Sequence, residues 1–432
     1  MPTRSQEIIY LSGSPLLRPQ VGRFVLLLLI LLVLLGVFGF IQQLPPFAET
    51  NLLGIYLLAL LTAAFLSIPA VLLLWYLDRR EREPAWLYWG ALLWGVVVAS
   101  GLIFILNATG INFITTNTFG LNPTQLEGLA NDDVLTLLDA SPNLLYELTG
   151  LALLALQVPI VQELIKGLAL VLLALLMRTE FNGVRDGIVY GGLIGLGFNL
   201  TETAIHATNS FFNLGGYGAL EQFISRFALA GLETHFLYTA LLGIGLGLAV
   251  QARGNFTKAL YALGGLLMAF LAHGIYTAFM PFAFGMIDGL LTALRESGTL
   301  TIGGNPIALG FLQYWLSTAL ASLTLHFFPL LVLLIALAQS GIWEQRIIQE
   351  QLADEVGRAI TFSEYRQLQN EGLFGLRRVR GYPRRISRHI VNAQNNLAFR
   401  KWGVKQEGGT PTTDPLIQAW RNRIAQLRRS PL

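Results

Sequence analysis

Residues 148–177 read LTGLALLALQVPIVQELIKGLALVLLALLM. As a helix, this stretch is long enough to cross the hydrocarbon layer of a membrane, which is about 30 Å thick and takes about 20 residues. Yet Glu163 and Lys166 lie in the middle of it. A charge at the bilayer centre costs at least about 2.5 kcal/mol on insertion, so it needs a structural or chemical reason. The stretch therefore predicts a membrane-spanning helix that carries a polar site.

Similar apolar runs recur along the chain, which is 53% hydrophobic and 13% charged. Together they predict eight spans, at residues 24–41, 52–77, 86–106, 148–177, 187–207, 227–250, 259–284 and 307–338. The predicted fold is all-α, a polytopic membrane bundle of about eight transmembrane helices with a helical C-terminal tail. Because the chain has no cysteine, disulfides and a thiolate nucleophile are excluded.

The positions of the basic residues predict the orientation. Cytoplasmic loops of membrane proteins collect lysine and arginine. If both ends of the chain are cytoplasmic, 26 of the 29 basic residues lie on the cytoplasmic side or in the tail. The exceptions are Lys166, inside a span, and Arg226 and Arg295, near external helix ends. We therefore expect a multi-pass protein of the cell membrane with both termini in the cytoplasm.

The chain divides into four predicted regions. Residues 1–147 hold three spans and an acidic external loop, residues 148–284 hold four spans that form the core, and residues 285–338 hold the last external loop and span. Residues 339–432 form the tail, with 16 basic and 8 acidic residues. Helix starts are predicted in the tail at Thr361 with Glu364, a capping box, and at Asp414 before Pro415. A basic tail is expected to lie near anionic lipid.

The four core spans all carry residues that are costly in lipid. Besides Glu163 and Lys166, they contain Glu202 in the fifth span, His235 in the sixth and His273 in the seventh. A lone buried histidine usually serves packing, but glutamates and histidines on four successive helices indicate a shared site. Glycines spaced four apart, as in Gly187, Gly191 and Gly195, predict close packing between these helices.

At these residues the sequence resembles the PrsW family of intramembrane proteases, which is related to the type II CAAX prenyl endopeptidases. The resemblance covers roughly residues 158–282. The Glu-Glu-x-x-Lys motif of the family corresponds to Gln162, Glu163 and Lys166, and its Phe-x-x-x-Glu motif to Phe198 and Glu202. Its two histidine motifs correspond to His235 and His273.

The resemblance implies an endopeptidase that activates water inside the membrane. Glu163 is expected to act as the general base, Glu202 to position the water, and His235 and His273 to stabilise the oxyanion or donate a proton. The expected supporting residues are Gln162, Lys166, Phe198 and Arg226. Two histidines and a carboxylate could also hold zinc, with His235, His273 and Glu202 as candidate ligands, and the sequence leaves the cofactor open.

Two positions depart from the family pattern. Gln162 replaces the first glutamate of its motif, and Thr277 stands four residues after His273, where the family often has Asn or Asp. An inactive membrane scaffold on the same fold is therefore an alternative to the protease. A transporter that uses the same buried charges as a proton or ion path is a further alternative. The expected partners are a single-span membrane protein as substrate and the lipid bilayer, and no nucleic acid.

Overall fold

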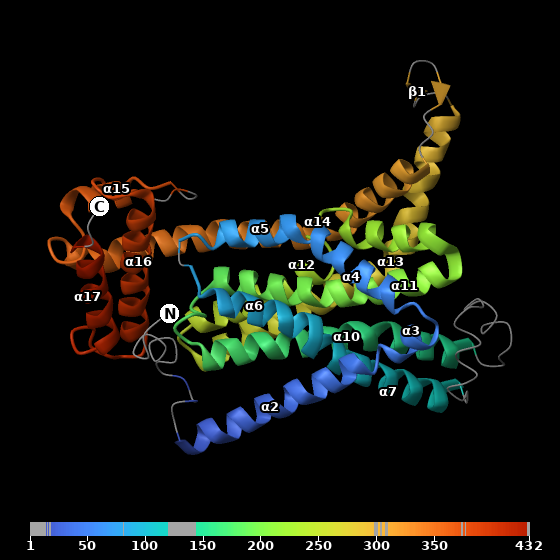
Figure 1. Cartoon of the computed structure of the whole chain (residues 1–432), viewed down its shortest axis with the longest axis horizontal. Helices are drawn as coiled ribbons and strands as arrows, with labels where there is room; N and C mark the ends of the chain where they lie inside the picture. Colours follow the sequence, from blue (N-terminus) through green and yellow to red (C-terminus); the bar gives the residue numbers. More distant parts are fainter. Residues whose placement is uncertain are drawn as a thin grey trace.

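The computed structural model of the chain is an elongated helical bundle with a smaller helical unit, the tail, at its C-terminal end (Figure 1). It describes residues 14, 16, 19–80, 82–119, 144–297, 301–302, 305–306, 310–372, 375 and 377–429. The bundle consists of α2 (Pro19–Ile41), α3 (Pro45–Glu49), α4 (Leu53–Leu66), α5 (Ile68–Leu77), α6 (Ala85–Leu93), the π-helical turn η2 (Trp94–Ala99), α7 (Ser100–Phe119), α10 (Leu144–Leu176), α11 (Val184–Phe227), α12 (His235–Gln251), α13 (Asn255–Glu296) and α14 (Gly310–Leu352). The predicted all-α membrane bundle is confirmed.

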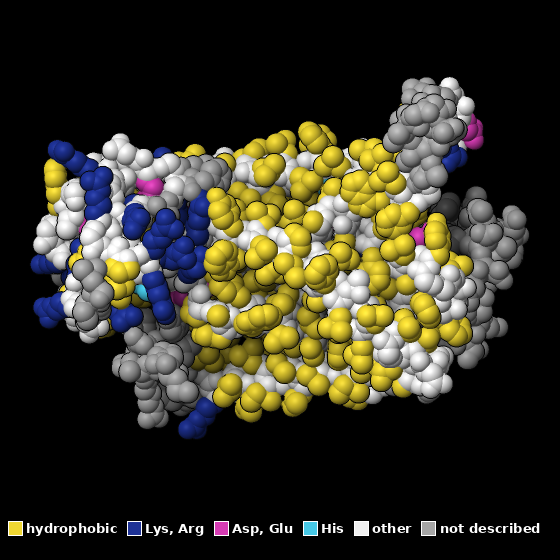
Figure 2. Space-filling model, turned by 45° about the horizontal axis from the view of Figure 1, so that its top comes forward, with side chains coloured by type: hydrophobic (Ala, Val, Ile, Leu, Met, Phe, Trp, Pro, Cys, Tyr) yellow, Lys and Arg dark blue, Asp and Glu magenta, His cyan; other side chains and the backbone are white. Residues whose placement is uncertain are grey.

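The described residues contain seven helical segments that are long and apolar enough to cross a membrane. The remaining predicted span corresponds to α12, an apolar helix of only 17 residues. Apolar side chains cover the visible surface of the bundle, and basic side chains gather at the end that carries the tail (Figure 2). A wide apolar surface of this kind is suited to contact with lipid chains.

Helices α11 and α12 pack closely through glycines. A Cβ atom added at Gly187 would collide with the backbone of Gly243, and one added at Gly195 would collide with the carbonyl of His235. Since lipid supplies no hydrophobic drive between helices, close backbone approach at small residues is a common packing solution in membranes. The predicted packing role of these glycines is confirmed, and it brings His235 against α11.

Helix α11 turns back on itself at Gly215, where φ is 65° and ψ is −155°. Glycine adopts positive φ without a steric penalty, so it suits this turn. The arm after the turn, residues 216–227, packs beside the first part of α11: Phe223 joins the apolar cluster that contains Ala204 and Ala207, and Arg226 pairs with Glu202. The arm therefore brings its last residues back into the bundle.

The predicted sixth span, 227–250, is wrong at its start. Phe227 ends the arm of α11, and α12 begins at His235. Three residues between them have positive φ, which a right-handed helix does not allow: Ala230 (59°), Gly231 (76°) and Thr234 (62°). Helix α12 therefore begins inside the bundle, which explains why it is shorter than the other spans.

Two other predicted boundaries also differ from the structure. The external loop expected between residues 107 and 146 is helical to Phe119 and again from Leu144, and residues 120–143 lie outside the described residues. Helices α13 and α14 are longer than predicted and bend away from the bundle as a pair, which ends in β1 (Thr301–Ile302) and β2 (Asn305–Pro306) (Figure 1). Within this pair, Asp288 Oδ1 accepts hydrogen bonds from Gln313 Nε2 and Ser317 Oγ, both at 2.9 Å.

The tail has its own apolar core and adjoins the bundle through α14, which runs unbroken past residue 338. It consists of η3 (Ala353–Glu355), α15 (Phe362–Gln369), α16 (Arg384–Gln406) and α17 (Pro415–Arg429). Arg80, beyond the end of α5, donates to the carbonyl of Gly341 at 2.9 Å, and its own carbonyl accepts from Asn395 of α16 at 2.7 Å. These contacts hold α16 against the end of the bundle.

Both predicted helix starts in the tail are confirmed. The hydroxyl of Thr361 accepts a hydrogen bond from the backbone N–H of Glu364 at 3.3 Å, in the predicted capping box. Asp414 Oδ1 accepts from the backbone N–H groups of Leu416 and Ile417, both at 3.0 Å, at the start of α17. These caps satisfy N–H groups that a helix leaves free at its first turn.

Candidate functional site

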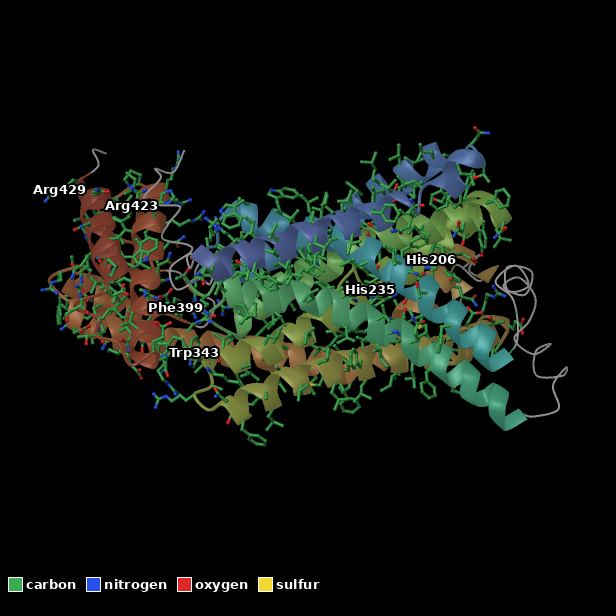
Figure 3. The ribbon with its side chains drawn as sticks, turned by 90° about the horizontal axis from the view of Figure 1, so that it is seen from below. His206, His235, Trp343, Phe399, Arg423 and Arg429 are labelled. Carbon is green, nitrogen blue, oxygen red and sulfur yellow. The ribbon has the colours of Figure 1, made fainter. Side chains whose placement is uncertain are left out.

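Four helices bring their ionisable residues together in one buried cluster. Glu163 comes from α10, Glu202 from α11, His235 from the first position of α12, and His273 from α13. Figure 3 shows His235 within the bundle, with His206 nearer the end opposite the tail. The four residues lie together in one site, as the sequence predicted. Their catalytic roles stay predictions.

Glu163 is the most enclosed member of the cluster, with a fully buried side chain. Its Oε1 atom accepts a hydrogen bond from Lys166 Nζ at 2.6 Å and lies 2.9 Å from His273 Nδ1. Because Glu163 and Lys166 are three residues apart, they lie on the same face of α10. The Oε2 atom has a longer contact, 3.5 Å from the hydroxyl of Thr239.

Glu202 is the centre of a second set of hydrogen bonds. Its Oε2 atom lies 2.6 Å from His235 Nε2 and pairs with the guanidinium of Arg226, and its Oε1 atom accepts from Gln162 Nε2 at 3.3 Å. The side chains of Glu202 and Arg226 are 16% and 17% exposed, whereas Glu163 and Lys166 are fully buried. The Glu202 side is therefore the more accessible edge of the cluster.

Lys166 joins the two sets. Its Nζ atom lies 3.1 Å from His235 Nδ1 as well as 2.6 Å from Glu163. An ammonium group only donates hydrogen bonds, so His235 Nδ1 accepts and His235 Nε2 carries the proton that faces Glu202. In the same way His273 Nδ1 carries the proton that faces Glu163. Each histidine is thus oriented by one glutamate, in the manner of a base held by a carboxylate.

The four predicted supporting residues all contact the cluster. Phe198 packs edge-on against His235, with ring centroids 4.7 Å apart, and Lys166 Nζ lies 5.1 Å from the centre of the Phe198 ring. Arg226 lies in the last turn of α11, and the returning arm of that helix brings its side chain to Glu202. Thr277, the second departure from the family pattern, is exposed on α13.

Several aromatic and polar residues around the cluster were not predicted. Tyr238 stacks on His273 with ring centroids 4.6 Å apart, and its hydroxyl lies 2.9 Å from His326 Nε2. Tyr276 in turn stacks on His326 at 4.7 Å. Spacing could have identified two of them, since Tyr238 follows His235 by three positions and Tyr276 follows His273 by three. His326 therefore serves packing and hydrogen bonding beside the cluster.

The cluster lies far from the tail. At about 1.5 Å per helical residue, Glu163, Glu202, His235 and His273 are roughly 20 to 27 Å from the ends of their helices nearest the tail. This depth is more than half of the thickness of a typical hydrocarbon layer, which is about 30 Å.

The cluster contains donor atoms of the kind that bind zinc. Glu163, His235 and His273 each offer one ligand atom within 4.8 Å of the others, and His₂Glu is a known zinc ligand set. However, Lys166 Nζ lies 2.6 Å from Glu163 Oε1 and 3.1 Å from His235 Nδ1. A zinc ion bound about 2 Å from these atoms would meet the lysine charge at close range. This arrangement does not fit a resident zinc ion, and Glu202 lies on the opposite side of His235.

Comparison with known protein families agrees with the location of the cluster. The model of the family described as PrsW family intramembrane metalloprotease matches residues 83–295, which include all four helix regions that supply the cluster. The match is wider than the resemblance found over residues 158–282, since it also takes in α6 and α7. No curated protein and no solved structure gives a significant match to this chain.

Proposed function

The chain belongs, over residues 83–295, to the PrsW family of intramembrane metalloproteases, and on this premise we propose that the buried cluster hydrolyses peptide bonds of a membrane-anchored protein. The observation that carries this proposal is the pairing of two glutamates with two histidines from four helices, bridged by Lys166. Hydrolysis needs a base, a group that stabilises the oxyanion and a proton for the leaving amine. The cluster supplies all three without a covalent intermediate.

In this proposal Glu163 activates the water. Lys166 and His273 both contact Oε1, which favours the ionised carboxylate, while Oε2 has only the longer contact to Thr239. A water O–H bond breaks, its proton passes to Glu163 Oε2, and the hydroxide oxygen bonds to the carbonyl carbon of the substrate. The positive charge of Lys166 stabilises the oxyanion that forms, while the N–H groups of His235 and His273 stay bonded to Glu202 and Glu163.

The second half of the reaction returns the proton. As the oxyanion collapses, the peptide C–N bond breaks and the proton held by Glu163 Oε2 passes to the leaving amine. Glu202 keeps His235 in the required tautomer and lies at the accessible edge, where it positions the incoming water. Arg226 and Gln162 fix the Glu202 carboxylate through the bonds described above.

A catalytically inactive scaffold is the second candidate, and Gln162 is the observation that favours it. This amide stands where the family motif has a glutamate, and it donates to Glu202 instead of accepting a proton. If the protein is an inactive scaffold, the wild-type chain cuts no substrate, and Gln162→Glu introduces cleavage. If it is an active protease, the wild-type chain already cuts its substrate.

We place the substrate and the membrane orientation in the same proposal. Basic side chains gather at the tail end of the bundle (Figure 2), which supports a cytoplasmic location for both termini in the cell membrane. The depth of the cluster then supports a cut near the external face of a single-span protein. Labelling of single cysteines introduced at Arg79 and Gly303 tests the orientation, because the chain has no native cysteine.

The experiment that tests the proposed activity uses the purified full chain in lipid vesicles with a library of single-span protein substrates. We expect at least one substrate to be cut by wild type and left intact by Glu202→Gln. The Asp288→Asn variant is a matched control, since it neutralises a carboxylate in the α13–α14 pair, away from the cluster. Equal cleavage by wild type and Glu202→Gln would refute the proposal.

A further inference from the structure

A cavity of roughly 580 Å³ lies between the tail and the end of the bundle. Residues at the ends of α10 and α12 and at the start of α13 line one side, and residues of α16 and α17 line the other. Figure 3 labels Phe399, one of the lining residues, where the tail meets the bundle. The catalytic cluster lies roughly 20 Å or more away along the helices, so the cavity is a separate site.

Three basic side chains in the lining lack an acidic partner. Arg178, Arg253 and Lys258 are exposed, and no ion pair joins any of them to a carboxylate among the described residues. Arg253 Nε donates to the neutral side chain of Gln406 at 3.0 Å. By contrast, Arg400, the fourth basic residue of the lining, pairs with Asp414 at 2.6 Å. The lining therefore has three cations available to an anion.

The acidic residues of the lining offset these cations only in part. They are Glu180 and Glu407. Burial raises the pKa of Glu180, which favours its neutral form and reduces the negative charge it brings to the cavity. Glu407 is the other, a single exposed acidic residue against three cations without an acidic partner. The cavity is positive on balance.

The same cavity continues onto apolar surface. Val171 and Leu175 of α10 are lining residues, and they are also 38% and 47% exposed on the membrane-spanning part of that helix. Trp402 and Trp420 complete the tail side of the lining. Tryptophan is enriched where membrane and water meet, because its ring is apolar and its N–H is polar.

We propose that this cavity binds the phosphate headgroup of an anionic glycerolipid. Arg178, Arg253 and Lys258 contact the phosphate, and the acyl chains leave along the exposed apolar face of α10. The volume lies within the range of small-ligand pockets, about 300 to 1,000 Å³, and accommodates a glycerophosphate group. A soluble phosphate ester has no use for the apolar exit at Val171 and Leu175, so the lining favours a lipid. The bound lipid links the tail to the bundle at the membrane surface.

Native mass spectrometry of the full chain tests this site. The protein is purified in neutral detergent and titrated with dioleoyl phosphatidylglycerol, dioleoyl phosphatidylcholine or soluble glycerol 1-phosphate. We expect one phosphatidylglycerol to be retained in preference to phosphatidylcholine, and no retention of glycerol phosphate. In the triple variant Arg178→Gln, Arg253→Gln and Lys258→Gln, retention should fall at least about tenfold, since each basic residue near an anionic lipid contributes about fivefold in affinity.

A second triple variant controls for general charge. Arg358→Gln, Arg378→Gln and Arg380→Gln remove the same charge from exposed tail positions outside the cavity lining, and retention should stay within about twofold. If the cavity triple does not fold, Arg253→Glu should lower retention while Arg253→Lys preserves it. Three results would each overturn the proposal: equal retention of the two lipids, equal loss in both triples, or equal binding of glycerol phosphate.

Discussion

His273 Nδ1 lies 2.9 Å from Glu163 Oε1, although the two residues are 110 positions apart in the chain. The contact joins α13 to α10 in the buried part of the bundle, and it fixes the tautomer of the histidine. His235 and Glu202 make the matching contact at 2.6 Å between α12 and α11. The two pairs are connected only through the ammonium of Lys166 among the described hydrogen bonds. Any loss of helix packing therefore separates groups that act together.

The glycine face between α11 and α12 should be required for activity. In Gly195→Ala the new Cβ would lie against the backbone carbonyl of His235, so α12 must shift and move the imidazole away from Glu202. We expect cleavage to fall by about tenfold or more, since a displacement of about 1 Å can cost a hundredfold in rate. Gly264→Ala on α13 is the control, because nothing lies within 4 Å of its added Cβ. Equal activity of the two variants would contradict the proposed role of this packing.

Metal analysis tests the position of Lys166. Because its ammonium lies against Glu163 and His235, we expect wild type to contain no stoichiometric zinc and to keep its activity after dialysis against a strong chelator. In Lys166→Ala the charge is removed and the three ligand atoms stay close together, so zinc binding should rise, as measured by elemental analysis. Loss of wild-type activity on chelation, restored by zinc, would establish a metal mechanism instead.

Acid should destabilise the tail. Burial opposes ionisation of Glu355, but hydrogen bonds from Arg421 and Lys401 outweigh it and hold the pKa of Glu355 below its usual value. A lowered folded-state pKa gives stability that is complete above the unfolded pKa, about 4.3, and is lost as the pH falls through the folded value. The melting temperature of the tail, followed by tryptophan fluorescence, should therefore drop between about pH 5 and pH 3.

Glu355→Gln provides the control for this pH dependence. The amide cannot ionise, so the variant should be less stable than wild type at pH 7 and should lose less stability on acidification. If wild type and Glu355→Gln respond to acid in the same way, the pairs with Arg421 and Lys401 do not stabilise the tail.

The depth of the cluster predicts where a substrate is cut. A transmembrane substrate helix resists hydrolysis until its backbone hydrogen bonds open, and opening is easiest near a helix end. Since the cluster lies roughly 20 Å or more from the tail ends of its helices, the cut should map to the half of the substrate span opposite the tail. Glycine or proline introduced there should speed cleavage several-fold, with the products identified by mass spectrometry. A cut in the third of the span nearest the tail would contradict this geometry.

Much of this arrangement could be predicted from the sequence, because a span needs a minimum apolar length and a charge buried in lipid is costly. Long apolar runs located the spans, and the cost of burying charge singled out Glu163, Glu202 and the two histidines. Glycines spaced by four residues indicated the α11–α12 contact, and cap motifs located two helix starts in the tail. In each case a short stretch of sequence is enough to indicate one structural feature.

The returning arm of α11 could not be predicted in the same way. Residues 208–226 were predicted to connect two spans and residues 227–234 to begin the second of them, because hydropathy does not reveal a helix that turns back at Gly215. Arg226 was predicted both near an external helix end and as a supporting residue of the site, and its pairing with Glu202 depends on this returning arm. Adjacent glycines at Gly215 and Gly216, followed by Gly231, were the signal that a break was present.

The most direct test of the proposed mechanism is the cleavage rate of Glu163→Gln on a substrate that wild type cuts. Glutamine keeps the size of the side chain but cannot accept the proton from water, and Oε1 can still contact Lys166 and His273. We expect the rate to fall by about a thousandfold or more, as for other residues that act as one catalytic unit, with the protein still inserted and Asp288→Asn unaffected. A Glu163→Gln protein that cleaves at the wild-type rate would contradict the assignment of Glu163 as the base.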